Sequence, residues 1–183
     1  MPLFAKWRAE RDLQRKAEAF VAVLFRDPAA SDIEWLASAA TRGDADHALW
    51  ELRYARRALG LIAAQRDALD DRTASVVARV IAEAMTRDQN VAAEMAETAE
   101  RQFNARLSAY RDGLAAKASA PTRVRMGQTL FAFAGGSFRK QDANILRAGD
   151  LLAAYLIEAN EALRESFGAA TLPENLPPSA VER

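Results

Sequence analysis

Hydrophobic residues recur at steps of three and four positions along most of this chain, which is the spacing of one face of an α-helix. The stretch 45–69 is apolar on more than one face, because two sets of apolar positions lie about a quarter-turn or more apart. The two sets are Leu49, Leu52, Ala55, Leu59, Ile62 and Ala63, and Trp50, Tyr54, Ala58, Leu61 and Ala68. A helix that is apolar over most of its circumference must be covered on several sides. We therefore expect 45–69 to be the central helix of the fold.

Residues that begin or end helices separate six further segments with helical periodicity. Three signals are predicted to end helices: Asp27-Pro28, Gly43 and Gly135-Gly136. Candidate helix starts are Ser31 in a capping-box pattern with Glu34, Asp44, either Asp71 or Thr73, and Pro121. The helices expected beside 45–69 are 2–26, a short one from 31, one that follows the turn at 70–73, 91–118, one from 121, and 141–167.

The chain shows no strand alternation and no internal repeat, so it predicts an all-α, single-domain bundle of about seven helices over 1–168. The tail at 169–183 is rich in proline and polar residues, and we expect little order there. Gly60 and Gly149 fall inside predicted helices, where each costs about 1 kcal/mol relative to alanine. A close approach between two helix backbones would offset that cost.

Composition narrows the class of protein. The chain has 183 residues, half of them apolar, with 25 Lys and Arg against 25 Asp and Glu, which suits one globular domain. The balanced charge disfavours a nucleic-acid binder. There is no cysteine, so disulfides and thiolate chemistry are excluded. No apolar run approaches the roughly 20 residues that span a bilayer, and charges interrupt the N-terminal residues, unlike a secretory signal. We therefore expect a cytoplasmic protein without a transmembrane segment.

Few residues point to catalysis or to metal binding. His47 is the only histidine, whereas helical-bundle metal sites use several. Glu94, Glu97 and Glu100 could share a helix face, but a solvated face with Glu97 paired to Arg101 explains them better. No nucleophile elbow or phosphate-binding loop is visible. We expect no catalytic residue, no metal and no cofactor, and the sequence favours a non-enzymatic protein over an enzyme.

The first helix begins with aromatic and basic residues that suit an interaction surface. Phe4 and Trp7 lie near Arg8 and Arg11, a mixture found at membrane interfaces and in partner grooves. These four residues are the candidate partner-binding site. The alternative is that the helix packs on its own bundle, since three acidic residues dilute the basic character: Glu10, Asp12 and Glu18.

The middle of 45–69 offers a second candidate site, formed by Arg53, Tyr54 and Arg56. Arg56 lies close to the apolar stripe, so its guanidinium is expected to be partly buried. A buried arginine must be paired or must bind an anion. The site is therefore either an internal ion pair or a pocket for a small anionic ligand, in a binding protein or an enzyme.

The run 95–116, MAETAERQFNARLSAYRDGLAA, resembles a helix of a known family at five positions: Met95, Phe103, Arg106, Ala109 and Tyr110. The segment 82–85 (AEAM) and the pair Arg56-Arg57, which ends an apolar stretch, fall in the same order. The family is that of the ubiquinol-cytochrome c chaperones. The resemblance implies a non-catalytic assembly factor for respiratory complex III, peripheral at the cytoplasmic face of the membrane.

Three hypotheses of function follow. The leading one is a helical protein that binds another protein, with an assembly factor for a membrane complex as its specific form. The second is a small anionic-ligand binder or enzyme that uses Arg53, Tyr54 and Arg56. The third is a homodimeric structural protein.

Overall fold

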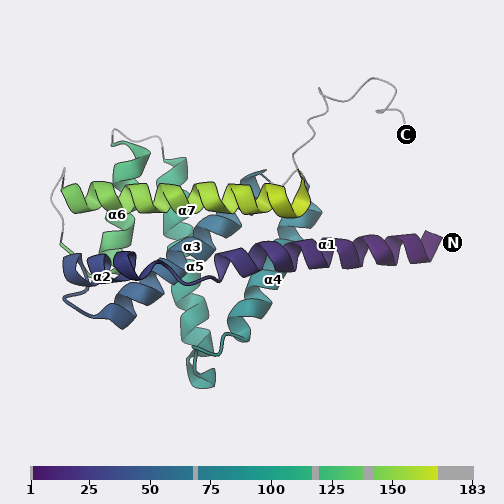
Figure 1. Ribbon diagram of the computed structural model, residues 1–183, viewed down its shortest axis with the longest axis horizontal. Helices are drawn as coiled ribbons and strands as arrows, with labels where there is room; N and C mark the ends of the chain where they lie inside the picture. Colours follow the sequence, from purple (N-terminus) through teal and green to yellow (C-terminus); the bar gives the residue numbers. More distant parts are fainter. Residues whose placement is uncertain (1, 68–69, 117–119, 138–141, 169–183) are drawn as a thin grey trace.

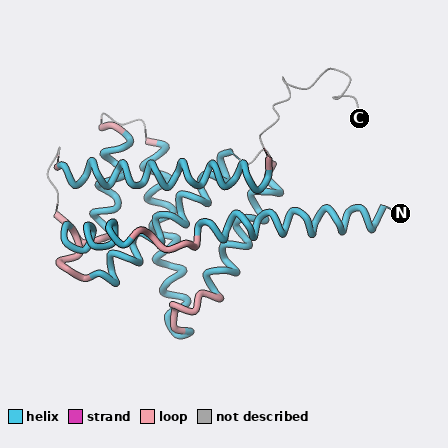
Figure 2. The backbone as a smooth tube through the Cα atoms, viewed as in Figure 1, coloured by secondary structure: helices cyan, strands magenta, loops and turns pink. Residues whose placement is uncertain are grey.

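The computed structural model of the protein describes residues 2–67, 70–116, 120–137 and 142–168 (Figure 1). Within these ranges the chain forms helices and loops only, and Figure 2 shows no strand among them. The seven α-helices are α1 (Pro2–Leu24), α2 (Ala30–Ala39), α3 (Ala45–Asp67), α4 (Asp71–Thr86), α5 (Ala96–Ala115), α6 (Thr122–Phe133) and α7 (Ala143–Phe167). A 3₁₀ turn, η1 (Ala93–Met95), precedes α5. The predicted all-α bundle is confirmed, whereas the tail at 169–183 lies outside the described residues.

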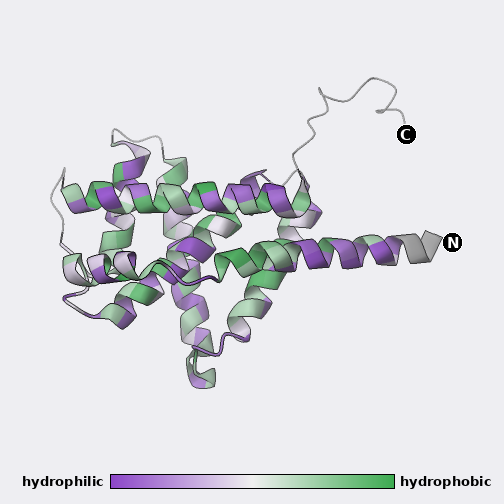
Figure 3. Ribbon diagram, in the orientation of Figure 1, coloured by the Kyte–Doolittle hydropathy of each residue, from purple (hydrophilic) through white to green (hydrophobic). Residues whose placement is uncertain are grey.

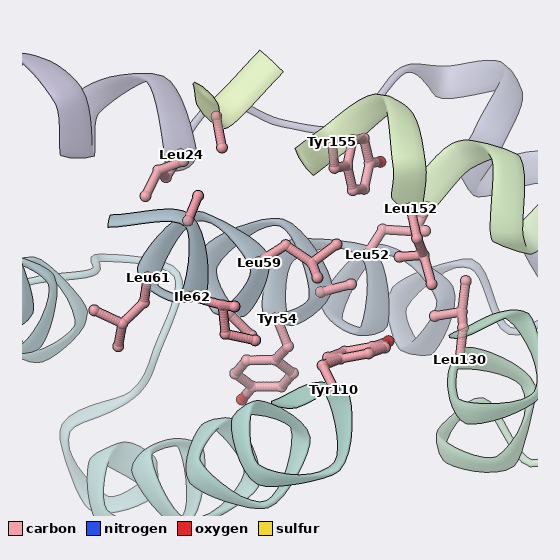
Figure 4. Packing of buried hydrophobic residues seen from close by; sticks show 14 of the residues in the cluster. Leu24, Leu52, Tyr54, Leu59, Leu61, Ile62, Tyr110, Leu130, Leu152 and Tyr155 are labelled. Atoms are coloured by element: carbon pink, nitrogen blue, oxygen red, sulfur yellow. The ribbon is translucent and has the colours of Figure 1, made fainter. Parts of the chain in front are cut away.

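Helix α3 is the central helix, as its two apolar faces predict. It contacts all six other α-helices, and every residue in 51–64 is buried. In Figure 4, Leu52 and Leu59 of α3 lie between Leu152 and Tyr155 of α7 on one side and Tyr110 of α5 on the other. Leu24 of α1 packs near the same core. Burial of this apolar surface is the main favourable term in the stability of the bundle.

Local hydrogen bonds decide where several helices begin. Asp44 caps α3 as predicted, because its carboxylate accepts from the backbone N–H of His47 at 2.9 Å. The capping box at Ser31 is wrong, since α2 starts earlier, after Ala29, which makes no side-chain cap. Asp70 caps α4 in place of Asp71 or Thr73, and it accepts from the Thr73 backbone N–H at 2.7 Å.

Helix α5 starts at Ala96, five residues later than the sequence predicts. A turn precedes this start, in which the Asp88 carboxylate accepts from both the backbone and the side-chain N–H groups of Asn90, at 3.1 and 2.8 Å, and Ala92 is then extended. This local turn competes with helical hydrogen bonding. The chain then passes through η1 before the regular helix begins.

Two glycines allow the backbones of α6 and α7 to approach each other closely. A Cβ at Gly149 of α7 would collide with the carbonyl oxygen of Arg123 in α6, and a Cβ at Gly127 of α6 would collide with that of Ile145 in α7. The expected backbone approach at Gly149 is therefore confirmed. At Gly60 the close neighbour is the Leu24 side chain, so that glycine makes room for a side chain of α1 rather than for a backbone.

Helix α1 has two parts. Its inner part packs on the bundle through Ala17, Phe20, Val21 and Leu24. Its outer part projects beyond the other helices toward the N-terminus (Figure 1), and within 6–16 every side chain is exposed or half-buried. Figure 3 shows the change from a hydrophobic inner part to a mainly hydrophilic outer part. We refer to residues 6–16 as the α1 arm.

Candidate functional site

The charged residues of α3 are buried. Glu51, Arg53, Arg56 and Arg57 are 1%, 8%, 7% and 3% exposed, respectively. A buried charge is tolerated only where a partner and further hydrogen bonds compensate its lost hydration. The partners of these four side chains therefore determine whether any of them can bind a ligand.

Arg53 and Arg56, two of the three predicted ligand residues, both reach the loop between α1 and α2. Arg53 Nε and Nη2 donate to Asp27 Oδ1 at 2.9 and 2.7 Å. Arg56 donates to the carbonyl oxygens of Arg26 and Asp27 at 3.3 and 3.4 Å, and it pairs with Glu158 of α7. Carboxylates of this chain therefore occupy positions at both guanidinium groups where an anionic ligand would bind.

Tyr54, the third predicted ligand residue, points the other way. Its hydroxyl donates to Gln102 Oε1 of α5 at 3.1 Å, and Figure 4 shows its ring on the side of α3 opposite Tyr155 of α7. The Arg56 guanidinium stacks on that Tyr155 ring at 5.4 Å. Burial raises the pKa of Tyr54 above its usual value. The structure therefore does not bring Tyr54 together with Arg53 and Arg56 around one pocket.

Arg57 forms a buried ion pair that no local pattern in the sequence identifies. It donates to Asp88 at 2.8 Å and lies over the Phe25 ring at 3.9 Å. Burial acts to raise the pKa of Asp88, but hydrogen bonds from Asn90 and from Arg57 outweigh it and hold the pKa below its usual value. The pair joins the loop that follows α4 to the central helix.

Glu51 and Arg106 form another buried ion pair. Arg106 of α5 donates from Nε to Glu51 Oε2 at 3.0 Å and from Nη2 to Oε1, which is a bidentate arrangement. Aromatic rings cover the guanidinium, at 4.4 Å for Phe133 and 5.2 Å for Tyr54. His47 Nε2 lies 3.4 Å from Glu51 at the solvent edge. Arginine donors therefore bind both oxygens of the Glu51 carboxylate.

No local pattern identified Glu51 or Arg57 as buried, and Arg106 entered only through the family resemblance. The all-round apolar character of 45–69 was the one signal available, because a helix covered on every side buries its charged residues as well. Their partners come from other helices, and the chain order does not reveal them.

The α1 arm carries three of the four predicted partner-binding residues. Trp7 is 53% exposed, and the Arg11 guanidinium lies 4.6 Å from the centre of its ring. Arg8 is exposed beside them. Phe4 is part of α1, but its side chain lies outside the described residues. The structure therefore places Trp7, Arg8 and Arg11 together on an accessible surface.

The acidic residues of this region have internal partners. Asp12 accepts a hydrogen bond from Arg15 at 2.7 Å and pairs with Lys16 at 2.9 Å. Glu18 accepts from Gln14 at 2.7 Å, and Glu10 pairs with Arg72 of α4 at 3.4 Å. Each of these carboxylates therefore has a basic or amide partner in α1 or α4.

A groove of about 500 Å³ runs between the α1 arm and α4. The half-buried side chains of Leu13 and Val76 form its floor. Its rim includes Trp7, Arg11, Arg72 and Arg79. Arg79 Nη2 donates to Gln14 Oε1 at 2.5 Å across the two helices. We refer to this feature as the α1–α4 groove.

A larger hollow of about 810 Å³ lies where α1, α3, α4 and α7 meet. Its apolar surface includes Leu13, Leu163 and Phe167. Three cationic and three acidic side chains line it, so its charges balance: Lys16, Arg66, Arg164, Asp12, Asp67 and Asp70. Most of these charges pair with one another, as Arg66 does with Asp67 at 2.7 Å.

In the part of the chain that the structure describes, no cluster of three His, Asp or Glu side chains could hold a metal ion. Glu97 pairs with Arg101 at 2.8 Å, as the sequence predicts. None of the described helices is both long and apolar enough to cross a bilayer. Comparison with family models, with curated proteins and with solved structures finds no match. The fold and the described side chains therefore define an all-α bundle with a projecting basic-aromatic helix.

Proposed function

We propose that this protein is a non-enzymatic helical protein that works by binding another protein through the α1 arm. The observation that supports this proposal is the position of Trp7, which is 53% exposed on a helix that projects beyond the bundle (Figure 1). Tryptophan and arginine are the side chains most enriched among residues that dominate binding energy at protein interfaces. Trp7, Arg8 and Arg11 provide both kinds on one helix face.

The charged residues of α3 support a binding protein over an enzyme or an anion binder. Arg53 and Arg56 would have to release Asp27 and Glu158 before they could bind an anionic ligand. Both guanidinium groups are buried, whereas the side chains of Asp27 and Glu158 are 65% and 38% exposed. A ligand would need to replace those contacts before it gained any affinity.

The specific form of the proposal is an assembly factor, or chaperone, for a respiratory membrane complex, peripheral at the cytoplasmic face of the membrane. It rests on the resemblance of 95–116 to the ubiquinol-cytochrome c chaperone family. Phe103, Arg106 and Tyr110, which carry much of that resemblance, are all buried. The resemblance therefore concerns packing residues, and experiment has to identify the complex.

The test is affinity capture from the native cell with the full chain as bait, with membrane and soluble fractions analysed separately. Replacing Phe4 and Trp7 by alanine should reduce partner recovery about 30-fold, the effect of losing one anchor worth about 2 kcal/mol. Ile157→Ala removes a side chain of similar exposure, 59%, from α7 and should change nothing. Circular dichroism checks that each variant folds.

Each outcome separates the hypotheses. Recovery of cytochrome b or its assembly factors would support the respiratory form, and a different partner would retain the binding function but remove that form. Equal recovery with the Phe4→Ala/Trp7→Ala variant would exclude the α1 arm. Recovery of the bait alone would favour self-association or ligand binding.

A further inference from the structure

The α1–α4 groove combines an apolar floor with a cationic rim. Leu13 of α1 and Val76 of α4 are half-buried at its floor. Three arginines and one glutamate line its rim: Arg11, Arg72, Arg79 and Glu10. Arg72 and Arg79 keep 56% and 54% of their side-chain surface exposed, so both remain accessible to a partner despite their internal contacts.

The positive charge continues on the outside of the arm. Arg8, Arg11 and Arg15 follow one another at three- and four-residue steps, so they share one face of α1 with Trp7 at its start. The chain as a whole has no net charge. The excess of arginine here is therefore a local feature, and complementary charge on a partner is what it favours.

From this chemistry we propose that the α1–α4 groove binds an amphipathic helix of the partner protein. The apolar face of that helix packs on Leu13, Val76 and Trp7, and its flanking Asp or Glu side chains pair with Arg11, Arg72 and Arg79. The inference rests on the proposed function and names the class of element recognised. The arm spans about 16 Å, or three helical turns, which accommodates anchors at i, i+3 or i+4, and i+7.

The same features disfavour two other occupants. A second copy of the α1 arm would bring Arg8 and Arg11 against an arginine-rich rim, and like charges repel. A lipid surface is broad and flat, so it could contact Trp7 on the outside of the arm. It could not reach Leu13 and Val76, which lie between two helices.

The experiment measures binding of synthetic helical peptides to the full chain by fluorescence anisotropy. One labelled peptide has leucine at the i, i+3, i+4 and i+7 positions with glutamate flanking them, and its matched control has lysine in place of each glutamate. We expect the glutamate peptide to bind at least tenfold more tightly. Vesicles of phosphatidylcholine with phosphatidylglycerol serve as the anionic lipid probe.

Variants locate the binding site. The double variant Arg72→Glu/Arg79→Glu should weaken binding of the glutamate peptide at least tenfold, and Val76→Asp should do the same through the groove floor. Arg101→Glu reverses an arginine on α5 that is 67% exposed, comparable to Arg72, and should leave binding unchanged. Circular dichroism and thermal unfolding verify that the variants remain folded.

Three results would overturn the inference. The first is equal affinity for both peptides, or no binding of the glutamate peptide. The second is undiminished binding of the glutamate peptide by the Arg72→Glu/Arg79→Glu variant. The third is a protein that does not bind the peptide but binds vesicles, or shows a doubled mass in solution, and loses this property in the Arg72→Glu/Arg79→Glu variant. If the Phe4→Ala/Trp7→Ala variant loses the captured partner but the arginine variant keeps it, the proposed function stands and this inference fails.

Discussion

At the scale of single residues, the unusual feature of this protein is the burial of four arginines in its interior. Arg53, Arg56 and Arg57 of α3 and Arg106 of α5 are at most 9% exposed. Taking such charges out of water costs several kcal/mol each, and the ion pairs and carbonyl contacts compensate that cost rather than add net stability. The pairs do specify geometry, because a bidentate arginine fixes the angle as well as the distance of its partner. Glu51 and Arg106 thus set the register between α3 and α5.

Replacing one partner of the Glu51–Arg106 pair should therefore lower the free energy of unfolding much more than replacing both partners. Arg106→Met leaves the Glu51 carboxylate buried without its main partner, and we expect the free energy of unfolding to fall by about 3–5 kcal/mol. The double variant Glu51→Leu/Arg106→Met removes both charges and should recover most of that loss. Urea unfolding of the single and double variants measures both values. Equal destabilisation by the two would show that the pair itself supplies net stability.

At the scale of helices, α6 and α7 make the most extensive contact among the described helices. Their backbones approach so closely that Gly127 and Gly149 each face a carbonyl oxygen of the other helix. Glycine lowers the stability of a helix interior by about 1 kcal/mol relative to alanine. The close approach accounts for its presence at both positions, since any side chain would separate the helices.

Alanine substitution should therefore be destabilising at a glycine that faces backbone, and not at a glycine that faces a flexible side chain. Gly149→Ala should lower the free energy of unfolding by about 1–3 kcal/mol, because the new methyl group meets backbone that cannot move without displacing α6. Gly113→Ala in α5 is the matched control. Its Cβ would lie 3.3 Å from the flexible Met126 side chain, so we expect no loss or a gain of up to about 1 kcal/mol. Thermal unfolding measures both, and a neutral Gly149→Ala would contradict the packing argument.

At the scale of the whole molecule, α1 belongs to the bundle at one end and to the surface at the other. Its inner part lies against α4 and α7, while the arm has hollows on two sides, the α1–α4 groove and the larger one toward α7. Few apolar side chains hold the arm in place, since the buried residues of α1 begin only at Ala17, after the arm. Such a segment opens at low free energy relative to the core.

Hydrogen exchange should separate the two parts of α1. We expect backbone amides in residues 6–12 to exchange at least about 100-fold faster than those in residues 17–24, because local opening of the arm exposes little apolar surface. Mass spectrometry of peptides from the two ranges measures the ratio, with residues 51–64 of α3 as the protected reference. Uniform slow exchange along all of α1 would mean that the arm is covered in solution, contrary to the proposed binding surface.

The amino-acid sequence alone predicted the all-α class, the central position of α3 and the cap at Asp44, because periodicity and capping depend on residues within one or two turns of each other. It also singled out Trp7, Arg8 and Arg11, since their types and spacing are local features. The predicted start of α5 was wrong because Ala92 is extended and 93–95 form a 3₁₀ turn, which the helical periodicity of 91–118 does not reveal.

Only the tertiary structure decided which charged residues are buried and what each of them contacts. Glu51 meets Arg106 and Arg57 meets Asp88 across helices that lie far apart in the chain, so no spacing rule pairs them. The same holds for the α1–α4 groove, where Arg72 and Arg79 become binding candidates only because α4 lies beside the arm. Local periodicity determines that a helix forms and which face is apolar, whereas ion pairs and grooves depend on how the helices pack.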